Sequence, residues 1–175
     1  LSRRLDMPYV SGPTEGKLWG NAVLSRFPVV ESSSYELPPR GLFIRRGYLV
    51  TKIDIGDGEN LTVIATHLHH ITGDSEIRQQ QVPVILETWG NAEMTVITGD
   101  MNAEPDSPEI RMFRDAGFID VMSGIIPPEG YTYHSADLYQ RIDYIWITPD
   151  LKAKNAGVFQ STASDHLPVI VEIDK

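Results

Sequence analysis

The order of apolar and polar residues predicts a chain of short strands with two helices. Residues 94–98 form a continuous, mostly apolar stretch that is rich in β-favouring side chains and stops at Gly99, as expected of a buried strand. Residues 47–55 alternate between apolar and polar side chains, which is typical of a strand with one buried face. A hairpin turn at residues 56–60 leads to a largely apolar strand at residues 61–65.

Helix signals occur at two places. Residues 75–89 carry a partly apolar stripe, although Pro83 should kink this helix. A second helix is expected to begin with Ser107 as its N-cap and Pro108 at its first position, and to end near Ala116. The remaining segments are expected as a last helical turn at residues 1–7, a loop at residues 9–17, and strands at residues 19–26, 29–37, 118–121, 131–134, 141–148, 151–159 and 167–173.

Polar side chains stand at the ends of several predicted strands. Asp100 and Asn102 come directly after the central strand, and ligands bind outside the carboxyl ends of strands in α/β sheets. Aspartate offers a carboxylate that binds a hard cation or accepts a proton, and asparagine can donate to a phosphoryl oxygen without repelling it. The alternative is that residues 99–102 are only a turn. Asn21 and Arg26 are the polar members of an earlier strand, with a strand edge and a turn as their alternative interpretation.

Asp143 lies within residues 142–147, a run that is otherwise apolar and aromatic. An unpaired buried carboxylate is costly, so Asp143 should have a cationic or hydrogen-bond-donating partner. A histidine from a neighbouring strand is the natural candidate, because an aspartate orients an imidazole and favours its protonated form. Asp165 and His166 stand just before the last predicted strand and supply both a carboxylate and a histidine.

Three histidines, His67, His69 and His70, follow the strand at residues 61–65. They invite a zinc interpretation, but zinc sites usually need further ligands at suitable spacing, and no carboxylate stands at a fitting distance along the chain. We favour a single functional His67 at the strand end, with His69 and His70 in the following loop.

Composition narrows the classes of function. The chain has 175 residues, enough for one domain with a real core, and we treat residues 1–175 as a single domain. It has no cysteine, so disulfides and cysteine-based zinc sites are excluded. The net charge of −9 and the pI of about 4.9 disfavour a broad basic surface for nucleic acid, although a phosphate substrate held through a metal stays compatible. No apolar run approaches the ~20 residues of a membrane span, no signal peptide is visible, and the localisation is unknown.

Five short motifs together carry a family resemblance. They are GNAVLSR at residues 20–26, THL at residues 66–68, GDMN at residues 99–102, RIDYI at residues 141–145 and SDHLPV at residues 164–169. In this order they resemble the endonuclease/exonuclease/phosphatase superfamily, which has the deoxyribonuclease I-like fold. The resemblance implies an α/β (α+β) fold, namely a four-layer α/β sandwich with two mostly antiparallel packed sheets. It also implies hydrolysis of a phosphodiester or phosphomonoester that depends on Mg²⁺ (or Mn²⁺).

The resemblance also assigns roles to individual residues. Asp100 would orient or activate the attacking water, and Asn102 would hold the phosphoryl group. His166 would contact the scissile phosphate, with Asp143 orienting it. The remaining expected members are His67 as a second phosphate-side histidine, Asp165 and Asp100 at the metal, and Asn21 and Arg26 lining the substrate site less directly.

One part of the family pattern has no counterpart in this sequence. The family has an N-terminal strand ending in asparagine and a following Gln-Glu pair whose glutamate is the main metal ligand, and neither occurs before Tyr9. We therefore expect the fold to be N-terminally truncated, lacking about 80 residues of a typical full domain. The metal site should then be incomplete and this chain weakly active or inactive, unless another residue such as Glu15 replaces the ligand. A sheet edge left exposed could support self-association.

Two functions follow as alternatives. The first is a metal-dependent phosphoesterase acting on nucleic acid, a phospholipid head group or a small phosphate. The second is a non-catalytic binding module of the same fold, which the polar cluster disfavours because a structural role does not require it.

Overall fold

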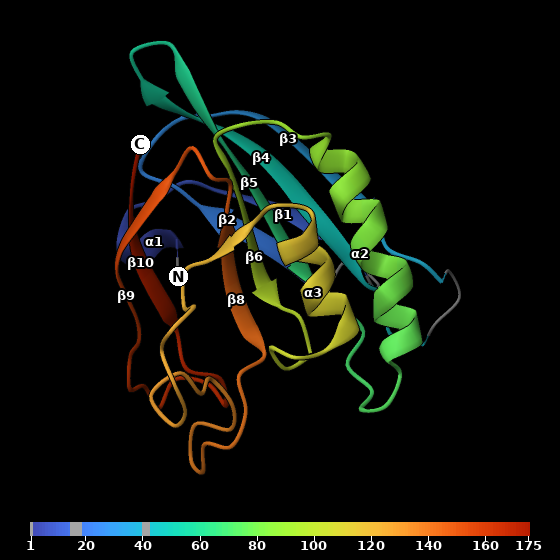
Figure 1. Ribbon diagram of the computed structural model, residues 1–175. Helices are drawn as coiled ribbons and strands as arrows, with labels where there is room; N and C mark the ends of the chain where they lie inside the picture. Colours follow the sequence, from blue (N-terminus) through green and yellow to red (C-terminus); the bar gives the residue numbers. More distant parts are fainter. Residues whose placement is uncertain (1, 15–18, 40–42) are drawn as a thin grey trace.

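The computed structural model describes residues 2–14, 19–39 and 43–175 (Figure 1). The elements follow in the order α1 (Ser2–Leu5), β1 (Tyr9–Pro13), β2 (Gly20–Leu24), β3 (Val29–Glu36), β4 (Gly47–Gly56), β5 (Glu59–His67), α2 (Ser75–Trp89), β6 (Thr95–Asp100), α3 (Pro108–Asp115), β7 (Ile119–Asp120), β8 (Asp143–Ile147), β9 (Lys152–Val158) and β10 (Val169–Asp174).

The centre of the fold is a six-stranded sheet with the strand order β3-β4-β5-β6-β8-β7. Neighbouring strands are antiparallel except for β5 and β6, which are parallel because α2 connects them as a crossover. The pairing register places His67 opposite Asp100, and Asp100 opposite Asp143. Three strands thus present a polar residue at the same level of the sheet.

Helices α2 and α3 lie side by side on one face of this sheet (Figure 1). Side chains alternate between the two faces of a strand, and Ile97 of β6 points towards the helices. It belongs to a dry core with Val82 and Ile85 of α2 and Phe113 of α3. The Phe113 ring stacks on Trp146 of β8 with 5.3 Å between the ring centroids. Apolar burial on this face therefore anchors both helices to the sheet.

The opposite face of the sheet carries two separate two-stranded sheets, β1-β2 and β9-β10 (Figure 1). Val96, the neighbour of Ile97, joins a second core there together with Ile147, Leu151 and Met122. The arrangement is an α/β sandwich, which confirms the predicted fold class. Within the described residues, the second sheet of the predicted sandwich takes the form of these two pairs.

The predicted loop at residues 9–17 is partly wrong. Residues 9–13 form β1, which pairs with β2 from Tyr9 opposite Leu24 to Pro13 opposite Gly20. Turn-favouring residues dominate this segment, but cross-strand hydrogen bonds override local propensity. Residues 15–18 lie outside the described part of the chain, and Glu15 with them.

The helix predicted at residues 75–89 is found with those bounds, continuing through an exposed Pro83.

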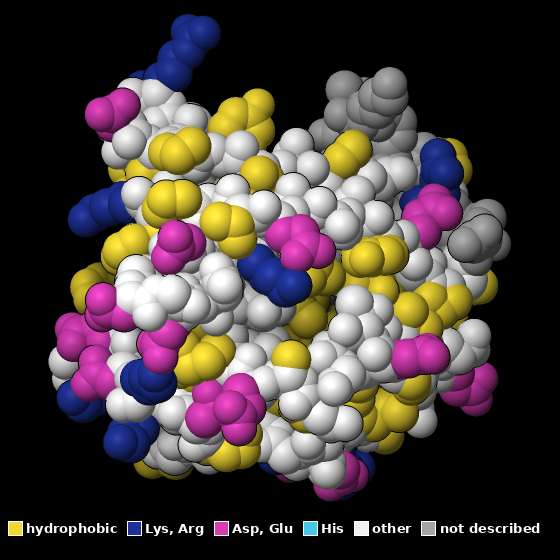
Figure 2. Space-filling view, turned by 90° about the horizontal axis from the view of Figure 1, so that it is seen from above, with side chains coloured by type: hydrophobic (Ala, Val, Ile, Leu, Met, Phe, Trp, Pro, Cys, Tyr) yellow, Lys and Arg dark blue, Asp and Glu magenta, His cyan; other side chains and the backbone are white. Residues whose placement is uncertain are grey.

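Figure 2 shows the end of the molecule opposite to the carboxyl ends of β5 and β6. Acidic and basic side chains are interspersed there with apolar ones, and no basic stripe crosses this face (Figure 2). Among the described helices, none is both long and apolar enough to cross a membrane.

Candidate active site

Three strand ends create the site. His67 is the last residue of β5, Asp100 is the last residue of β6, and Asp143 is the first residue of the antiparallel β8. The register aligns them, and Nε2 of His67 lies 3.3 Å from Oδ2 of Asp100. The carboxylates of Asp100 and Asp143, which are 43 positions apart in sequence, become neighbours only through this pairing.

Gly99 allows β5 and β6 to approach each other just before Asp100. Its φ of 144° lies in the region that favours glycine, and a Cβ at this position would stand 1.9 Å from the carbonyl oxygen of Thr66. Any side chain here would push the strands apart and separate His67 from Asp100. The glycine of the GDMN motif is thus required by the spacing of the site.

His166 completes the group from the loop between β9 and β10. Its Nδ1 is 2.8 Å from Oδ2 of Asp143, so the predicted hydrogen bond between these residues is present. Its Nε2 lies 3.9 Å from Oδ2 of Asp100, too far for a direct hydrogen bond but suited to an oxygen atom between them. Ligand atoms of Asp100, Asp143 and His166 all lie within 4.8 Å of one another.

The segment at residues 131–141 holds the histidine loop in place. Thr132 accepts a backbone hydrogen bond from Leu167 at 2.8 Å, and its Oγ1 accepts from the backbone amides of Ile142 and Asp143. The Tyr133 ring lies 4.8 Å from the His166 ring, centroid to centroid. Asp143 and His166 are therefore positioned by one common segment.

The environment raises the pKa of both Asp100 and His166. Burial, with the charge of Asp143 as the second cause, raises the pKa of Asp100 to about 6. The hydrogen bond that His166 donates to Asp143 raises the pKa of His166 above its ordinary value, against the opposing effect of burial. Asp100 can therefore accept a proton near neutral pH, while His166 is favoured in its protonated form.

His67 behaves differently from His166. Burial, with the positive charge of Arg46 as the second cause, lowers the pKa of His67 to about 3. The imidazole is neutral at neutral pH, so its 3.3 Å contact with Asp100 is a polar contact and not an ion pair. A neutral ring beside a carboxylate can donate through Nε2 to an oxygen atom without changing the charge of the site.

Asn102 adopts a left-handed backbone conformation, with φ of 49°. This conformation, which asparagine tolerates, lets its backbone amide donate to Oδ1 of Asp100 at 2.8 Å. Its side-chain Nδ2 donates to the carbonyl oxygen of Leu68 at 3.2 Å. Asn102 thereby ties the loop after β6 to the loop after β5.

A cleft of about 570 Å³ opens over these residues. His67, Asp100, Asn102, Asp165 and His166 all line this cleft. Asp143 lies behind His166 and lines an adjoining hollow of about 420 Å³ that shares His166 with the cleft. Further lining residues are Arg46, His70, Thr72, Tyr133, Tyr139 and Gln140.

Asn21 lies beside the site in a small hollow that His67 also lines, whereas Arg26 lies away from the cleft. Asn21 acts at one remove, because its Nδ2 donates to the carbonyl oxygen of Gly47 at 2.8 Å, and Gly47 pairs with His67. Arg26 is exposed beyond the other end of β2 and does not line the cleft. The strand β2 can bring only one of its ends to the site, which is why the two residues separate.

Arg46 is a cleft residue that the sequence analysis missed. It directly precedes Gly47, so the β4–β5 pairing brings it beside His67, and its charge acts on Asp100, His67 and His70. Its Nε is buried and finds no hydrogen-bond partner among the residues that the structure describes. Two consecutive arginines before a strand that pairs with the His67 strand were the available sequence signal.

The histidine-rich segment divides as the favoured interpretation expects. His69 is buried and its Nε2 is 2.9 Å from Oδ2 of Asp74, whereas His70 is exposed at the cleft. Within the described residues, the group suited to a metal ion is Asp100, Asp143 and His166, and it contains neither His69 nor His70. The geometry gives the zinc alternative no support.

The fold and the strand-end site define an α/β sandwich of the deoxyribonuclease I-like class. The chain belongs to the endonuclease/exonuclease/phosphatase family, whose sequence profile matches residues 3–166. No curated protein sequence matches the chain significantly.

Solved structures show the same fold at low sequence identity. An endonuclease/exonuclease/phosphatase from Beutenbergia cavernae DSM 12333 is 23% identical with a TM-score of 0.76, over 94% of this chain and 53% of that one. A mannosyl-6-phosphatase from Bacteroides thetaiotaomicron VPI-5482 is 21% identical with a TM-score of 0.81, over 97% of this chain and 77% of that one. The human Nocturnin catalytic domain with bound sulfate anion is 20% identical with a TM-score of 0.80, over 98% and 73%.

The chain thus spans about half of the Beutenbergia structure and about three quarters of the other two. At these identities the likeness establishes the fold. The expectation that the chain lacks an N-terminal part stays a prediction.

Proposed function

We propose that this chain carries the catalytic side chains of a metal-dependent phosphoesterase. The observation that supports this most is the alignment of His67, Asp100 and Asp143 on three adjacent strands, with His166 bonded to Asp143 in front of them. Phosphoryl transfer depends on positioning and on neutralising charge, and this group supplies a base, a cationic donor and neutral donors in one cleft.

Asp100 would accept the proton of the attacking water. Its raised pKa of about 6 makes it a base suited to neutral pH, and its Oδ1 is fixed by the backbone amide of Asn102. Its Oδ2 faces both His67 and His166, so a water molecule there would lie among three polar side chains. General base catalysis of this kind contributes about 100- to 10,000-fold.

His166 would hold the phosphoryl group and stabilise its developing charge. Asp143 fixes the ring through Nδ1, which leaves Nε2 free to donate into the cleft.

Asn102, neutral His67 and Arg46 would supply further donors for the phosphoryl oxygens. Arg46→Gln should then raise KM for a phosphate ester about tenfold, the scale of one hydrogen bond to a charged group, and steady-state kinetics would measure it.

The donor chemistry of the cleft fits a hard divalent cation such as Mg²⁺ or Mn²⁺. Asp100 offers a carboxylate oxygen, which these ions prefer, within the group it forms with Asp143 and His166, and Asp165 is a second carboxylate at the cleft that lies outside this group. When bound, the cation would polarise the phosphoryl group and neutralise its charge. Two carboxylates fall short of the near-octahedral oxygen shell that Mg²⁺ requires, so the remaining positions would fall to water or to other residues.

The nature of the ester stays open among nucleic acid, a phospholipid head group and a small phosphate. One structural neighbour is named a mannosyl-6-phosphatase and another holds a sulfate anion, which is compatible with phosphate monoesters and diesters alike. A panel of a phosphodiester, a sugar phosphate, a single-stranded oligonucleotide and a phosphocholine lipid, each with Mg²⁺ and with EDTA, tests the proposal. Hydrolysis of one class that is lost in EDTA supports it, and phosphate binding without turnover of any substrate favours the non-catalytic module.

A further inference from the structure

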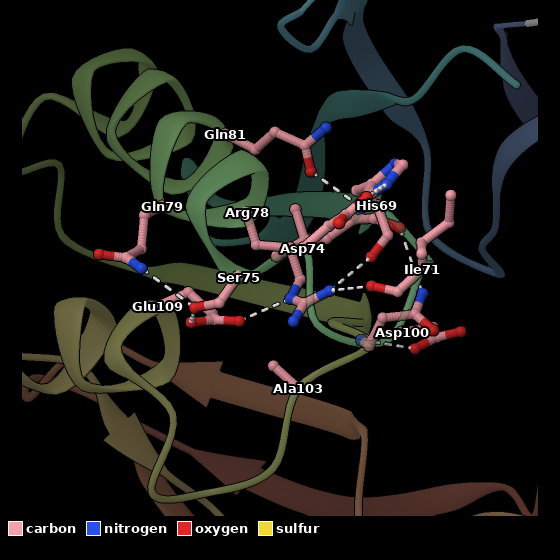
Figure 3. Close-up of polar contacts among 12 residues, drawn as sticks. His69, Ile71, Asp74, Ser75, Arg78, Gln79, Gln81, Asp100, Ala103 and Glu109 are labelled. Atoms are coloured by element: carbon pink, nitrogen blue, oxygen red, sulfur yellow. Dashed lines mark hydrogen bonds and ion pairs between the residues drawn. The ribbon is translucent and has the colours of Figure 1, made fainter. Parts of the chain in front are cut away.

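A buried ion pair joins α2 to α3 beside the cleft. Arg78 is 5% exposed and Glu109 is fully buried, and Nε of Arg78 donates to Oε1 of Glu109 at 2.5 Å (Figure 3). Oε2 of Glu109 accepts a second hydrogen bond from Oγ of Ser75 at 2.6 Å. Both charges are therefore paired and hydrogen-bonded, as buried charges need to be.

The same arginine also holds the loop that follows His67. Its Nη1 donates to the carbonyl oxygens of His69 at 3.2 Å and Ile71 at 3.1 Å, so this loop curves around the guanidinium (Figure 3). Gln81, one turn further along α2, accepts from the backbone amide of His69 at 2.9 Å. Three backbone groups of the loop are thus satisfied by side chains of α2.

Glu109 stands at the end of the loop that follows Asp100. It lies in the first turn of α3, two positions after the loop of residues 101–107, which lines the cleft through Asn102, Ala103, Glu104 and Ser107. Near the strands these two loops are joined by Asn102, which donates to the carbonyl oxygen of Leu68. Further out they are joined by the pair of Arg78 and Glu109, so the two loops are fastened at both ends.

Stability alone does not account for this pair. A buried ion pair is on average no more stabilising than well-packed apolar residues of the same size, because both charges must be desolvated. A planar guanidinium does offer something an apolar pair cannot, since it donates in fixed directions to a carboxylate and to two carbonyl oxygens at once. The arrangement fixes the positions of the two loops at the wall of the cleft.

We propose that Arg78 and Glu109 are positioning residues, which set the two loops so that Asn102 and His67 face the substrate correctly. This inference rests on the proposed phosphoesterase function. Arg78 lines the cleft, but its Nε is bonded to Glu109 and its Nη1 to the two loop carbonyl oxygens, so we expect neither residue to contact the substrate. Misplacing a catalytic group by about 1 Å can cost about 100-fold in rate, so a small loop shift should be visible in kcat.

The test compares Arg78→Lys, Arg78→Met and a double variant on the ester that the protein hydrolyses. Arg78→Lys keeps the positive charge opposite Glu109 but loses the planar guanidinium that donates to several acceptors at once. We expect kcat to fall at least about tenfold while KM changes less than about twofold. The double variant Arg78→Met with Glu109→Leu removes both charges together. It should melt at a higher temperature than Arg78→Met alone, yet kcat should stay low because the carbonyl contacts are still missing.

Arg111→Lys is the matched control, since Arg111 is exposed on α3 and does not line the cleft. It should leave kcat, KM and the melting temperature unchanged. Recovery of wild-type kcat in the double variant would show that the pair only links the helices. A rise in KM at constant kcat in Arg78→Lys would show that Arg78 binds the substrate directly, and either result overturns the proposal.

A second measurement separates this inference from the proposed function. If the wild-type protein hydrolyses no ester of the panel, the proposed function fails, and the positioning of Asn102 is then read by NMR in the metal-free protein. The side-chain amide signals of Asn102 should move and exchange faster in both Arg78 variants but not in Arg111→Lys. Unchanged Asn102 signals in both variants would overturn the positioning role.

Discussion

Two histidine–aspartate pairs with nearly the same nitrogen–oxygen distance have different surroundings. Nδ1 of His166 is 2.8 Å from Asp143, and Nε2 of His69 is 2.9 Å from Asp74. The His166 side chain is 27% exposed and its second nitrogen faces the cleft, whereas the His69 side chain is 3% exposed. Nδ1 of His69 is buried and has no partner among the described residues.

The difference shows that a histidine–aspartate distance does not define a catalytic pair. His166 has one nitrogen held by Asp143 and one available to a ligand, which is what proton transfer or phosphate binding needs. His69 is buried, and its backbone amide and carbonyl groups are bonded to Gln81 and Arg78. We therefore interpret the His166 pair as chemical and the His69 pair as structural.

The largest expected effect is a loss of hydrolytic activity when the His166 site is disrupted. His166→Ala and Asp100→Ala should each reduce Mg²⁺-dependent hydrolysis of a phosphodiester by at least about 100-fold, because each removes an acid/base or electrostatic group. Their melting temperatures should change little, and initial rates with thermal melts would measure both. Rates like those of the wild type in both variants would remove the proposed mechanism.

Exchanging each aspartate for asparagine sharpens the comparison. In the metal-free protein, Asp143→Asn should lower the pKa of His166, because Asp143 is the main cause of its raised value. The folded-state pKa is above the unfolded one, so the pair stabilises the fold below the ordinary histidine pKa, and this contribution is lost as the pH rises through the folded value. Histidine NMR titration and pH-dependent melts check this.

Asp74→Asn is the matched control for that experiment. It leaves the Asp143 contact intact, so the pKa of His166 should stay where it is. A His166 pKa that falls equally in both variants would show that general charge, and not the hydrogen bond to Asp143, sets it.

His69 should show the reverse of the His166 result. His69→Ala removes a buried side chain with its bond to Asp74, and we expect a loss of about 1–3 kcal/mol in the free energy of unfolding. The rate of ester hydrolysis should fall much less than in His166→Ala. Urea unfolding with a parallel activity assay would measure both, and a rate loss as large as that of His166→Ala would contradict the division between the pairs.

The smallest expected effect is the response of the 175-residue chain to Mg²⁺ alone. Binding should be weak in calorimetric titration because few carboxylate ligands are available. Any NMR shifts on adding Mg²⁺ should appear at His166 and not at His69. Tight binding with robust turnover would show that a further residue, such as Glu15, completes the metal site.

Local patterns in the sequence were enough for most elements and for part of the site. The apolar stripe and the glycine that follows predict α2 at residues 75–89, which is the observed helix. The cost of burying Asp143 predicts a histidine partner, and the SDHLPV segment supplies it as His166. These predictions succeed because periodicity, capping and charge burial act over short stretches of chain.

Tertiary structure alone decided the rest. The register that aligns His67, Asp100 and Asp143, the pairing that turns residues 9–13 into a strand, and the burial of Arg78 against Glu109 all join distant positions. It also brought Arg46 into the cleft and left Arg26 outside it, although both are arginines near strand ends. Strand register depends on which side chains pack and which backbone groups pair across the sheet, and no local pattern in a single segment contains that information.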